Sequence, residues 1–89
     1  MTARTIALTL VGKPGCHLCD DAREVVTAVR EEVAALPDGP DVAYEELDIL
    51  QDETLFERFA EEIPVVLLDG EVHGYWRIDP TRLKTALLG

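Results

Sequence analysis

The sequence predicts an α/β fold in which helices flank one mixed sheet of four strands, in the order β-α-β-α-β-β-α. Three observations support this. A β-branched apolar segment, a long helical stripe and a second strand pattern form a βαβ unit, which gives two parallel strands. Farther on, an Asp-Gly pair joins two short strand patterns into an antiparallel hairpin. With 89 residues, the chain is expected to form a single domain spanning 1–89.

The first strand is predicted from Thr5 to Val11, with apolar or neutral side chains on both faces, as in a central strand covered on both sides. A helix follows from about His17 to Leu36, with acidic residues in its first turns, where the helix dipole favours negative charge. The Pro-Asp-Gly-Pro run at 37–40 ends it. Its apolar stripe comprises Leu18, Ala22, Val25, Val26, Val29, Val33 and Leu36.

The second strand is predicted from Val42 to Ile49, at a sheet edge because Glu45 and Glu46 are adjacent. A short helix follows over 52–62 with Asp52 as its N-cap. The apolar side of this helix comprises Leu55, Phe56, Phe59 and Ile63.

The C-terminal part is predicted to form a hairpin and a last helix. The hairpin strands are Val65–Leu68 and Glu71–Tyr75, on either side of the Asp-Gly pair. Asp79 and Pro80 fit the N-cap and the first residue of the helix. Because both faces of the sheet must be covered, we expect helices on both.

Composition limits the functions that the chain can have. Eighteen Asp and Glu against eight Lys and Arg give a net charge of −10, which disfavours general binding to nucleic acid. No stretch of about 18 uncharged apolar residues exists, so we expect no membrane span. The apolar run Thr5–Val11 is short and lacks a cleavage site, unlike a secretory signal. We therefore expect the protein to be cytoplasmic. We also expect it to be a monomer.

Cys16 and Cys19 are the strongest chemical signal, because they lie where a predicted strand gives way to a long helix. Unpaired backbone N–H groups and the positive end of the helix dipole favour the thiolate form of Cys16 there. Cys19 lies one turn farther on and can reach back to form a disulfide. We predict that Cys16 attacks a substrate disulfide and that Cys19 resolves the mixed disulfide.

Metal binding is an alternative reading of the two cysteines. A structural zinc site needs four ligands, and only His17 and His73 remain as typical partners, with His17 held between the cysteines. We therefore predict no metal site and no bound cofactor. Two further functions stay open: an iron–sulfur or metal carrier in which two chains share the ligands, and a non-catalytic interaction module.

The Cys-His-Leu-Cys run at 16–19, the Ile63-Pro64 pair and the Asp-Gly turn after it resemble a glutaredoxin-type member of the thioredoxin superfamily, over nearly the whole chain. The resemblance implies a thioredoxin-like fold and a thiol–disulfide oxidoreductase that reduces protein disulfides or glutathione mixed disulfides. It also implies that the Ile63–Pro64 bond is cis and lies beside the cysteines. The Ile63 backbone would then pair with an extended substrate segment.

Two residues next to the cysteines are candidates for substrate binding. Lys13 occupies the position of the basic residue that precedes the first cysteine by three in glutaredoxins, where a cation supports the thiolate and attracts a glutathione carboxylate. An ordinary solvated lysine is the alternative. His17 either tunes the Cys16 thiolate or is an exposed spacer. Asp20 and Asp21 oppose the thiolate by like-charge repulsion.

The stretch after the hairpin departs from glutaredoxins, which carry two glycines and then an acidic residue that holds glutathione. Gly74 can stand for the first glycine, but Tyr75 replaces the second and hinders close approach of a ligand to the backbone. Asp79 is better explained as a helix cap. Tyr75 and Trp76 either line a substrate groove, with Arg77 pairing an acidic group, or pack the sheet edge against the last helix. Packing is the favoured reading.

This region is more similar to the glutaredoxin-like redoxins that supply electrons to ribonucleotide reductase. The shared features are a Pro-Val-Val strand, an Asp-Gly turn followed by Glu, and a later Gly-aromatic pair and Arg. Those redoxins take electrons from thioredoxin reductase. The expected partners are therefore a disulfide-containing protein and an electron donor that is either glutathione or a thioredoxin reductase system.

Overall fold

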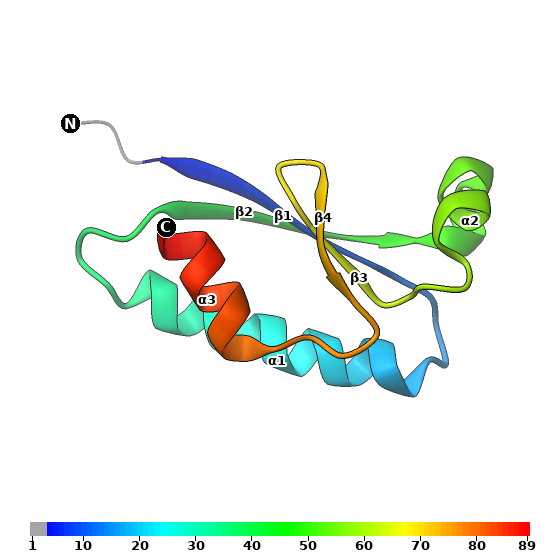
Figure 1. Ribbon diagram of the computed structural model, residues 1–89, viewed down its shortest axis with the longest axis horizontal. Coiled ribbons are helices and arrows are strands. Elements are labelled where there is room, and N and C mark those ends of the chain that lie inside the picture. The colour runs from blue at the N-terminus through cyan, green and yellow to red at the C-terminus, as the bar shows by residue number, and fades with distance from the viewer. Residues whose placement is uncertain (1–3) are drawn as a thin grey trace.

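The computed structural model describes residues 4–89 and contains the predicted series of strands and helices, with one short 3-10 helix added (Figure 1). The elements are β1 (Thr5–Gly12), α1 (His17–Ala34), β2 (Asp41–Asp48), η1 (Ile49–Gln51), α2 (Glu53–Phe59), β3 (Val65–Leu68), β4 (Glu71–Tyr75) and α3 (Pro80–Leu88). Both hairpin strands have the predicted bounds. The long helix ends earlier than predicted, and the short helix is limited to 53–59.

The sheet is mixed and has the strand order β2-β1-β3-β4. β1 runs parallel to β2 and antiparallel to β3, and β3 runs antiparallel to β4. The prediction of a four-stranded mixed sheet with β2 at an edge is thus confirmed. The hairpin turn places Asp69 at φ 51° and Gly70 at φ 84°. Positive φ at both positions is the geometry that an Asp-Gly hairpin favours.

One face of the sheet is covered by α1 and α3, which lie on the same side of it (Figure 1). Alternate residues of β1 point into this layer, because side chains along a strand alternate between the two faces. The apolar cluster there is the larger of two, and we call it the large cluster. Its buried members are Ile6, Leu8, Leu10, Ala22, Val26, Val29, Val33, Val66, Ile78, Leu83 and Leu87.

The opposite face is covered at one end only. There α2 and η1 pack on a second group of buried residues, which we call the small cluster: Val11, Ile49, Phe59, Val65 and Leu67. Toward the other end of β1, Thr5 and Ala7 are exposed. The expectation of helices on both faces is therefore correct only at the end that carries α2, because a seven-residue helix cannot span the sheet.

Two residues of the predicted apolar stripes are exposed instead of buried. Phe56 is 49% exposed, whereas Phe59 is 2% exposed. Only one narrow side of the short α2 faces the sheet, and Phe59 is the residue buried there. Leu36 is 40% exposed because α1 has already ended at Ala34.

The two short helices begin as predicted. The Asp52 side chain accepts hydrogen bonds from the N–H groups of Thr54 and Leu55 at the start of α2. Asp79 does the same for two N–H groups of α3, with Pro80 as the first helical residue. Each cap satisfies backbone donors that the helix itself leaves unpaired. Within residues 4–89, none of the helices combines the length and the apolar character needed to span a bilayer.

Candidate active site

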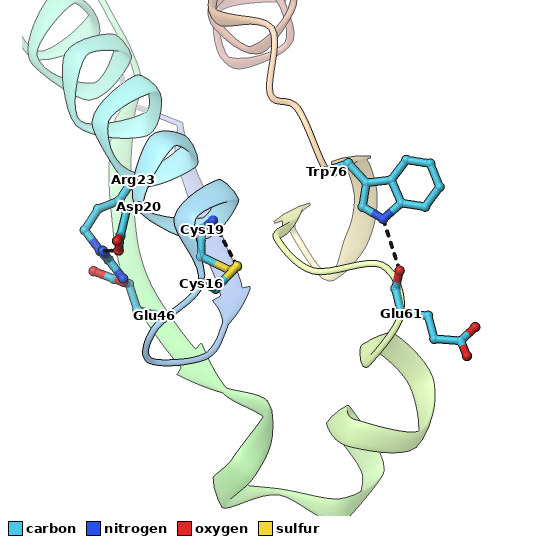
Figure 2. Close-up of a disulfide and its surroundings, with 7 residues drawn as sticks. All are labelled: Cys16, Cys19, Asp20, Arg23, Glu46, Glu61 and Trp76. Carbon is cyan, nitrogen blue, oxygen red and sulfur yellow. Dashed lines mark hydrogen bonds and ion pairs between the residues drawn. A yellow bond between two sulfur atoms is a disulfide. The ribbon is translucent and has the colours of Figure 1, made fainter.

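The cysteine pair lies at the N-terminal end of α1. Cys16 is the N-cap residue, and a disulfide joins it to Cys19, with the two Cα atoms 5.2 Å apart. The Cys19 N–H donates a hydrogen bond to the Cys16 Sγ at 3.1 Å (Figure 2). Cys19 is 1% exposed, whereas Cys16 is half-buried. Cys16 is therefore the sulfur that a substrate can reach, and it accepts an N–H at the helix end where negative charge is stabilised.

Gly12, the last residue of β1, makes room for the buried cysteine. A Cβ atom at this position would lie 2.9 Å from the Cys19 Sγ, closer than real Cβ contacts allow. Any other residue would displace the sulfur. Gly12 was not among the site residues expected from the sequence, where it directly follows the predicted strand Thr5–Val11. A glycine between that strand and the cysteine motif is the signal that could have found it.

The strand register brings Pro64 to the same place. Val11 of β1 pairs with Val65 of β3, and the two strands are antiparallel. Gly12, which follows Val11, and Pro64, which precedes Val65, are therefore neighbours. The Ile63–Pro64 bond is cis, as the resemblance implied, and Pro64 is buried. Three elements thus meet at the cysteines: the end of β1, the start of α1 and the start of β3.

The backbone of Ile63 is only partly available to a substrate. Its N–H donates to the carbonyl of Phe59 at 3.1 Å, at the end of α2. Among residues 4–89, no hydrogen bond reaches the Ile63 carbonyl. Of the Ile63 backbone, which was expected to pair with a substrate segment, the N–H is therefore already occupied, because it satisfies a carbonyl in the last turn of α2.

Lys13 and His17 are both exposed beside the cysteines. Lys13 lines a shallow hollow on the β2 side of the motif, together with Asp20, Arg23 and Glu46. His17 is the first residue of α1. Both residues therefore lie at the surface next to the cysteine motif.

Arg23 holds one of the acidic residues that were expected to oppose the thiolate. Its guanidinium pairs with Asp20 at 2.9 Å and with Glu46 of β2 at 2.8 Å (Figure 2). Hydrogen bonds to Glu46 and then to Asp20 raise the pKa of Arg23. The pair with Asp20 reduces the repulsion that this carboxylate exerts on a nearby thiolate. Sequence reasoning missed this contact because Arg23 and Glu46 are far apart in the chain.

Tyr44 lies close to this group on β2. The Arg30 guanidinium stacks over its ring, with 4.2 Å from Cζ to the ring centroid. The Tyr44 hydroxyl is buried and has no hydrogen-bond partner among residues 4–89. Burial, with a further contribution from the charge of Glu46, raises the pKa of Tyr44 to about 12. This side chain is therefore neutral at physiological pH.

Tyr75 and Trp76 do not pack against α3 as the favoured reading predicted. They are 47% and 52% exposed, and their rings meet edge to face with centroids 5.1 Å apart. Ile78, which is 9% exposed, fills the space next to α3 instead. Gly74 is half-buried, and a Cβ there would come no closer than 3.9 Å to Ile78, an ordinary contact.

Trp76 is fixed by its own backbone and side chain. Its φ of 64° is in the left-handed region, which bulky residues rarely adopt. Its N–H donates to the Pro64 carbonyl at 2.8 Å, and its indole Nε1 donates to the Glu61 carbonyl at 3.1 Å (Figure 2). Leu18, from within the cysteine motif, lines a hollow with Tyr75, Trp76 and Arg77. These aromatics thus line a hollow at the surface instead of packing against α3.

No group of three or more His, Cys, Asp or Glu side chains gathers to hold a metal within the part of the chain that the structure describes. His73, the other histidine, lies on β4. Burial, followed by the charge of Arg82, lowers its pKa.

Comparison with known proteins agrees with the cysteine motif and the sheet. The model of the glutaredoxin-like domain (DUF836) matches residues 7–88. The chain belongs to the glutaredoxin-like family. An uncharacterized relative in this comparison, protein Rv0508 of Mycobacterium tuberculosis, is 31% identical over 78 residues, which cover 84% of this chain and 75% of that protein.

Solved structures show the fold of this glutaredoxin-like protein. Protein Ne2328 of Nitrosomonas europaea superposes with a TM-score of 0.76 at 17% identity, covering 98% of this chain and 96% of that one. A mutant thioredoxin from Halobacterium salinarum superposes with a TM-score of 0.61 at 21% identity, covering 94% and 73%. The thioredoxin-like fold predicted from the sequence is confirmed.

Proposed function

We propose that this protein is a thiol–disulfide oxidoreductase in which Cys16 attacks disulfides and Cys19 resolves the intermediate. The observation that carries the proposal is the asymmetry of the cysteine pair. The half-buried Cys16 Sγ accepts an N–H at the helix end, while Cys19, 1% exposed, lies one turn behind it. Family membership and the thioredoxin-like fold support it.

The reaction balances in two exchange steps. The Cys16 thiolate attacks one sulfur of the substrate disulfide, a new S–S bond forms, and the other substrate sulfur leaves as a thiolate that takes up a proton. Cys19 then loses its proton and attacks the Cys16 sulfur, which releases the second substrate thiolate. Two electrons pass to the substrate, and the protein is left with the Cys16–Cys19 disulfide that the structure contains.

Residues around the pair are proposed to hold the substrate. The Ile63 carbonyl, next to Pro64, is the backbone acceptor for an extended segment. Lys13 and His17 are exposed where we propose that they contact an anionic group. On the other side, Tyr75 lines a hollow with Leu18, and we propose that Gly74, which precedes Tyr75 on β4, also contacts the substrate. We propose a disulfide-containing protein as the substrate and either glutathione or a thioredoxin reductase system as the electron donor. We also propose that the protein acts as a cytoplasmic monomer.

Reduction of insulin disulfides and of hydroxyethyl disulfide, each coupled to either donor system, tests this function. We expect turnover with at least one donor, and none after Cys16→Ser. Cys19→Ser leaves Cys16 without its resolving partner, so a mixed disulfide with the substrate should accumulate and be seen by mass spectrometry. Absence of turnover with both donors would contradict the proposal. A comparison of the rates at which the two donors reduce the oxidised protein identifies the donor.

A further inference from the structure

We propose that the hollow lined by Leu18, Tyr75, Trp76 and Arg77, here called the aromatic hollow, binds the segment of a partner protein that flanks its disulfide. We further propose that it selects segments in which an apolar side chain stands next to a carboxylate. This inference rests on the proposed function, since it specifies the substrate that Cys16 would attack.

The conformation of Trp76 is the first argument. A φ of 64° is unfavourable for a bulky L-residue, and such strain persists only where surrounding contacts impose it. Here the hydrogen bonds to the carbonyls of Pro64 and Glu61 impose it. The strain does not serve the core, because 52% of Trp76 stays exposed. It holds an aromatic surface at a fixed place over the loop that leads into β3.

The position of the hollow is the second argument. Leu18 lies between the two cysteines in the chain, so the hollow shares a residue with the cysteine motif. Figure 2 shows Trp76 on the side of the cysteine pair opposite the Arg23 ion pairs. The edge-to-face contact with Tyr75 gives the hollow a second rigid apolar wall. Grouped exposed aromatic side chains with a polar rim are typical of protein-binding surfaces.

Charge identifies the occupant. Arg77 is the only charged residue that lines the aromatic hollow, and among residues 4–89 it forms no ion pair. Arg23, in contrast, already binds two carboxylates. A guanidinium without a partner matches a carboxylate in a bidentate geometry. The net charge of −10 repels acidic partners at a distance, but at about 0.15 M salt such repulsion is screened beyond about 8 Å.

Binding can be measured without any redox step, because Trp76 is the only tryptophan of the chain and its fluorescence reports on the hollow. The probes are two short peptides with serine in place of cysteine, alike except that a Phe is followed by Asp in one and by Asn in the other. At physiological salt, we expect the Asp peptide to change the fluorescence and to bind about threefold more tightly than the Asn peptide.

Variants assign this preference to Arg77. Arg77→Gln should abolish it, and Arg77→Lys, which keeps the charge, should retain part of it. Lys84→Gln is the matched control, because Lys84 lies on α3 and its one ion pair, with Glu32, is 3.8 Å long. It should keep the full preference. The inference is overturned if neither peptide changes the fluorescence at millimolar concentration, or if Arg77→Gln keeps the preference.

A kinetic measurement separates this inference from the proposed function. The same two peptides, each carrying a disulfide, are compared with hydroxyethyl disulfide as substrates of the reduced protein. Trp76→Ala should lower the ratio of peptide to small-disulfide rate constants about tenfold. An unchanged ratio would contradict the proposal that the aromatic hollow binds the partner segment, and it would leave the proposed oxidoreductase activity intact. If the protein reduces none of these disulfides yet the Asp peptide still binds with the Arg77-dependent preference, the oxidoreductase fails and the hollow stands as a binding site.

Discussion

The two faces of the sheet differ in how they are covered. The face under α1 and α3 carries the large cluster, which extends along β1 and reaches both helices. The opposite face carries the small cluster, which lies beneath α2 at one end. Because apolar burial stabilises a fold roughly in proportion to the area removed from water, the first face supplies most of the stability.

The candidate site lies at the end of the sheet where the small cluster is. The N-terminal end of α1 and the helix α2 share this end of the molecule (Figure 1). Gly12, Pro64 and Trp76 come from strand ends there, held by close packing and hydrogen bonds. In the proposed function, α1, whose apolar stripe is buried in the large cluster, would carry the nucleophile, and less covered segments would contact the substrate. Three predictions, each with a control variant, test how the two faces and the site between them are stabilised.

Phe59→Ala should give the largest effect. Phe59 is the bulkiest member of the small cluster and is 2% exposed, so its truncation should lower the free energy of unfolding by about 3–5 kcal/mol. Phe56→Ala, at a side chain that is 49% exposed, should cost less than about 0.5 kcal/mol and is the matched control. Chemical denaturation measures both.

A domain of this size can fail to fold after such a loss, so Phe59→Leu gives a milder version. It should still cost about 1 kcal/mol. Equal stability of the Phe59 and Phe56 variants would show that the small cluster does not hold α2 in place.

Gly12→Ala should have the next largest effect, and it acts where the stable strand meets the site. The new Cβ would lie 2.9 Å from the Cys19 Sγ, so the free energy of unfolding should fall by about 1–3 kcal/mol. Gly74→Ala is the control, because its Cβ meets only Ile78 at 3.9 Å and should cost less than about 1 kcal/mol. Thermal unfolding of the oxidised proteins measures the difference. If the two variants unfold alike, the close approach of Gly12 to Cys19 is not decisive.

The smallest expected effect is a pH dependence of the free energy of unfolding that comes from His73, which lies on β4 near α3. Burial and the charge of Arg82 lower the pKa of His73 below its ordinary 6.5, so the unfolded chain takes up a proton first as the pH falls. The stabilisation from the neutral ring is therefore present above about pH 6.5 and is lost as the pH falls through the pKa of the folded state.

This pH dependence is measured by comparing wild type with His73→Gln, which cannot titrate. Between about pH 7.5 and pH 5, the melting temperature of wild type should fall relative to that of the variant. An equal pH dependence of both proteins would show that His73 titrates as it does in the unfolded chain.

The sequence by itself determined the elements and the chemical pair. The Asp-Gly turn, the caps Asp52 and Asp79, and the cysteines at the start of a long helix are signals contained within a few neighbouring residues, and all of them agree with the structure. Their physical causes are local hydrogen bonds and local φ preferences, so they can be recognised without knowing which distant segments pack nearby.

Only the tertiary structure decided the surroundings of the cysteines. The approach of Gly12 to Cys19, the Arg23–Glu46 pair and the Trp76–Pro64 bond join residues from different elements. The exposure of Phe56 and of Trp76 was mispredicted for the same reason. An apolar residue is buried only if another element lies over it, and which element does so depends on strand register and helix length. The spacing of apolar residues along the chain shows which side chains could be buried. The element that covers them is decided by how the sheet is assembled.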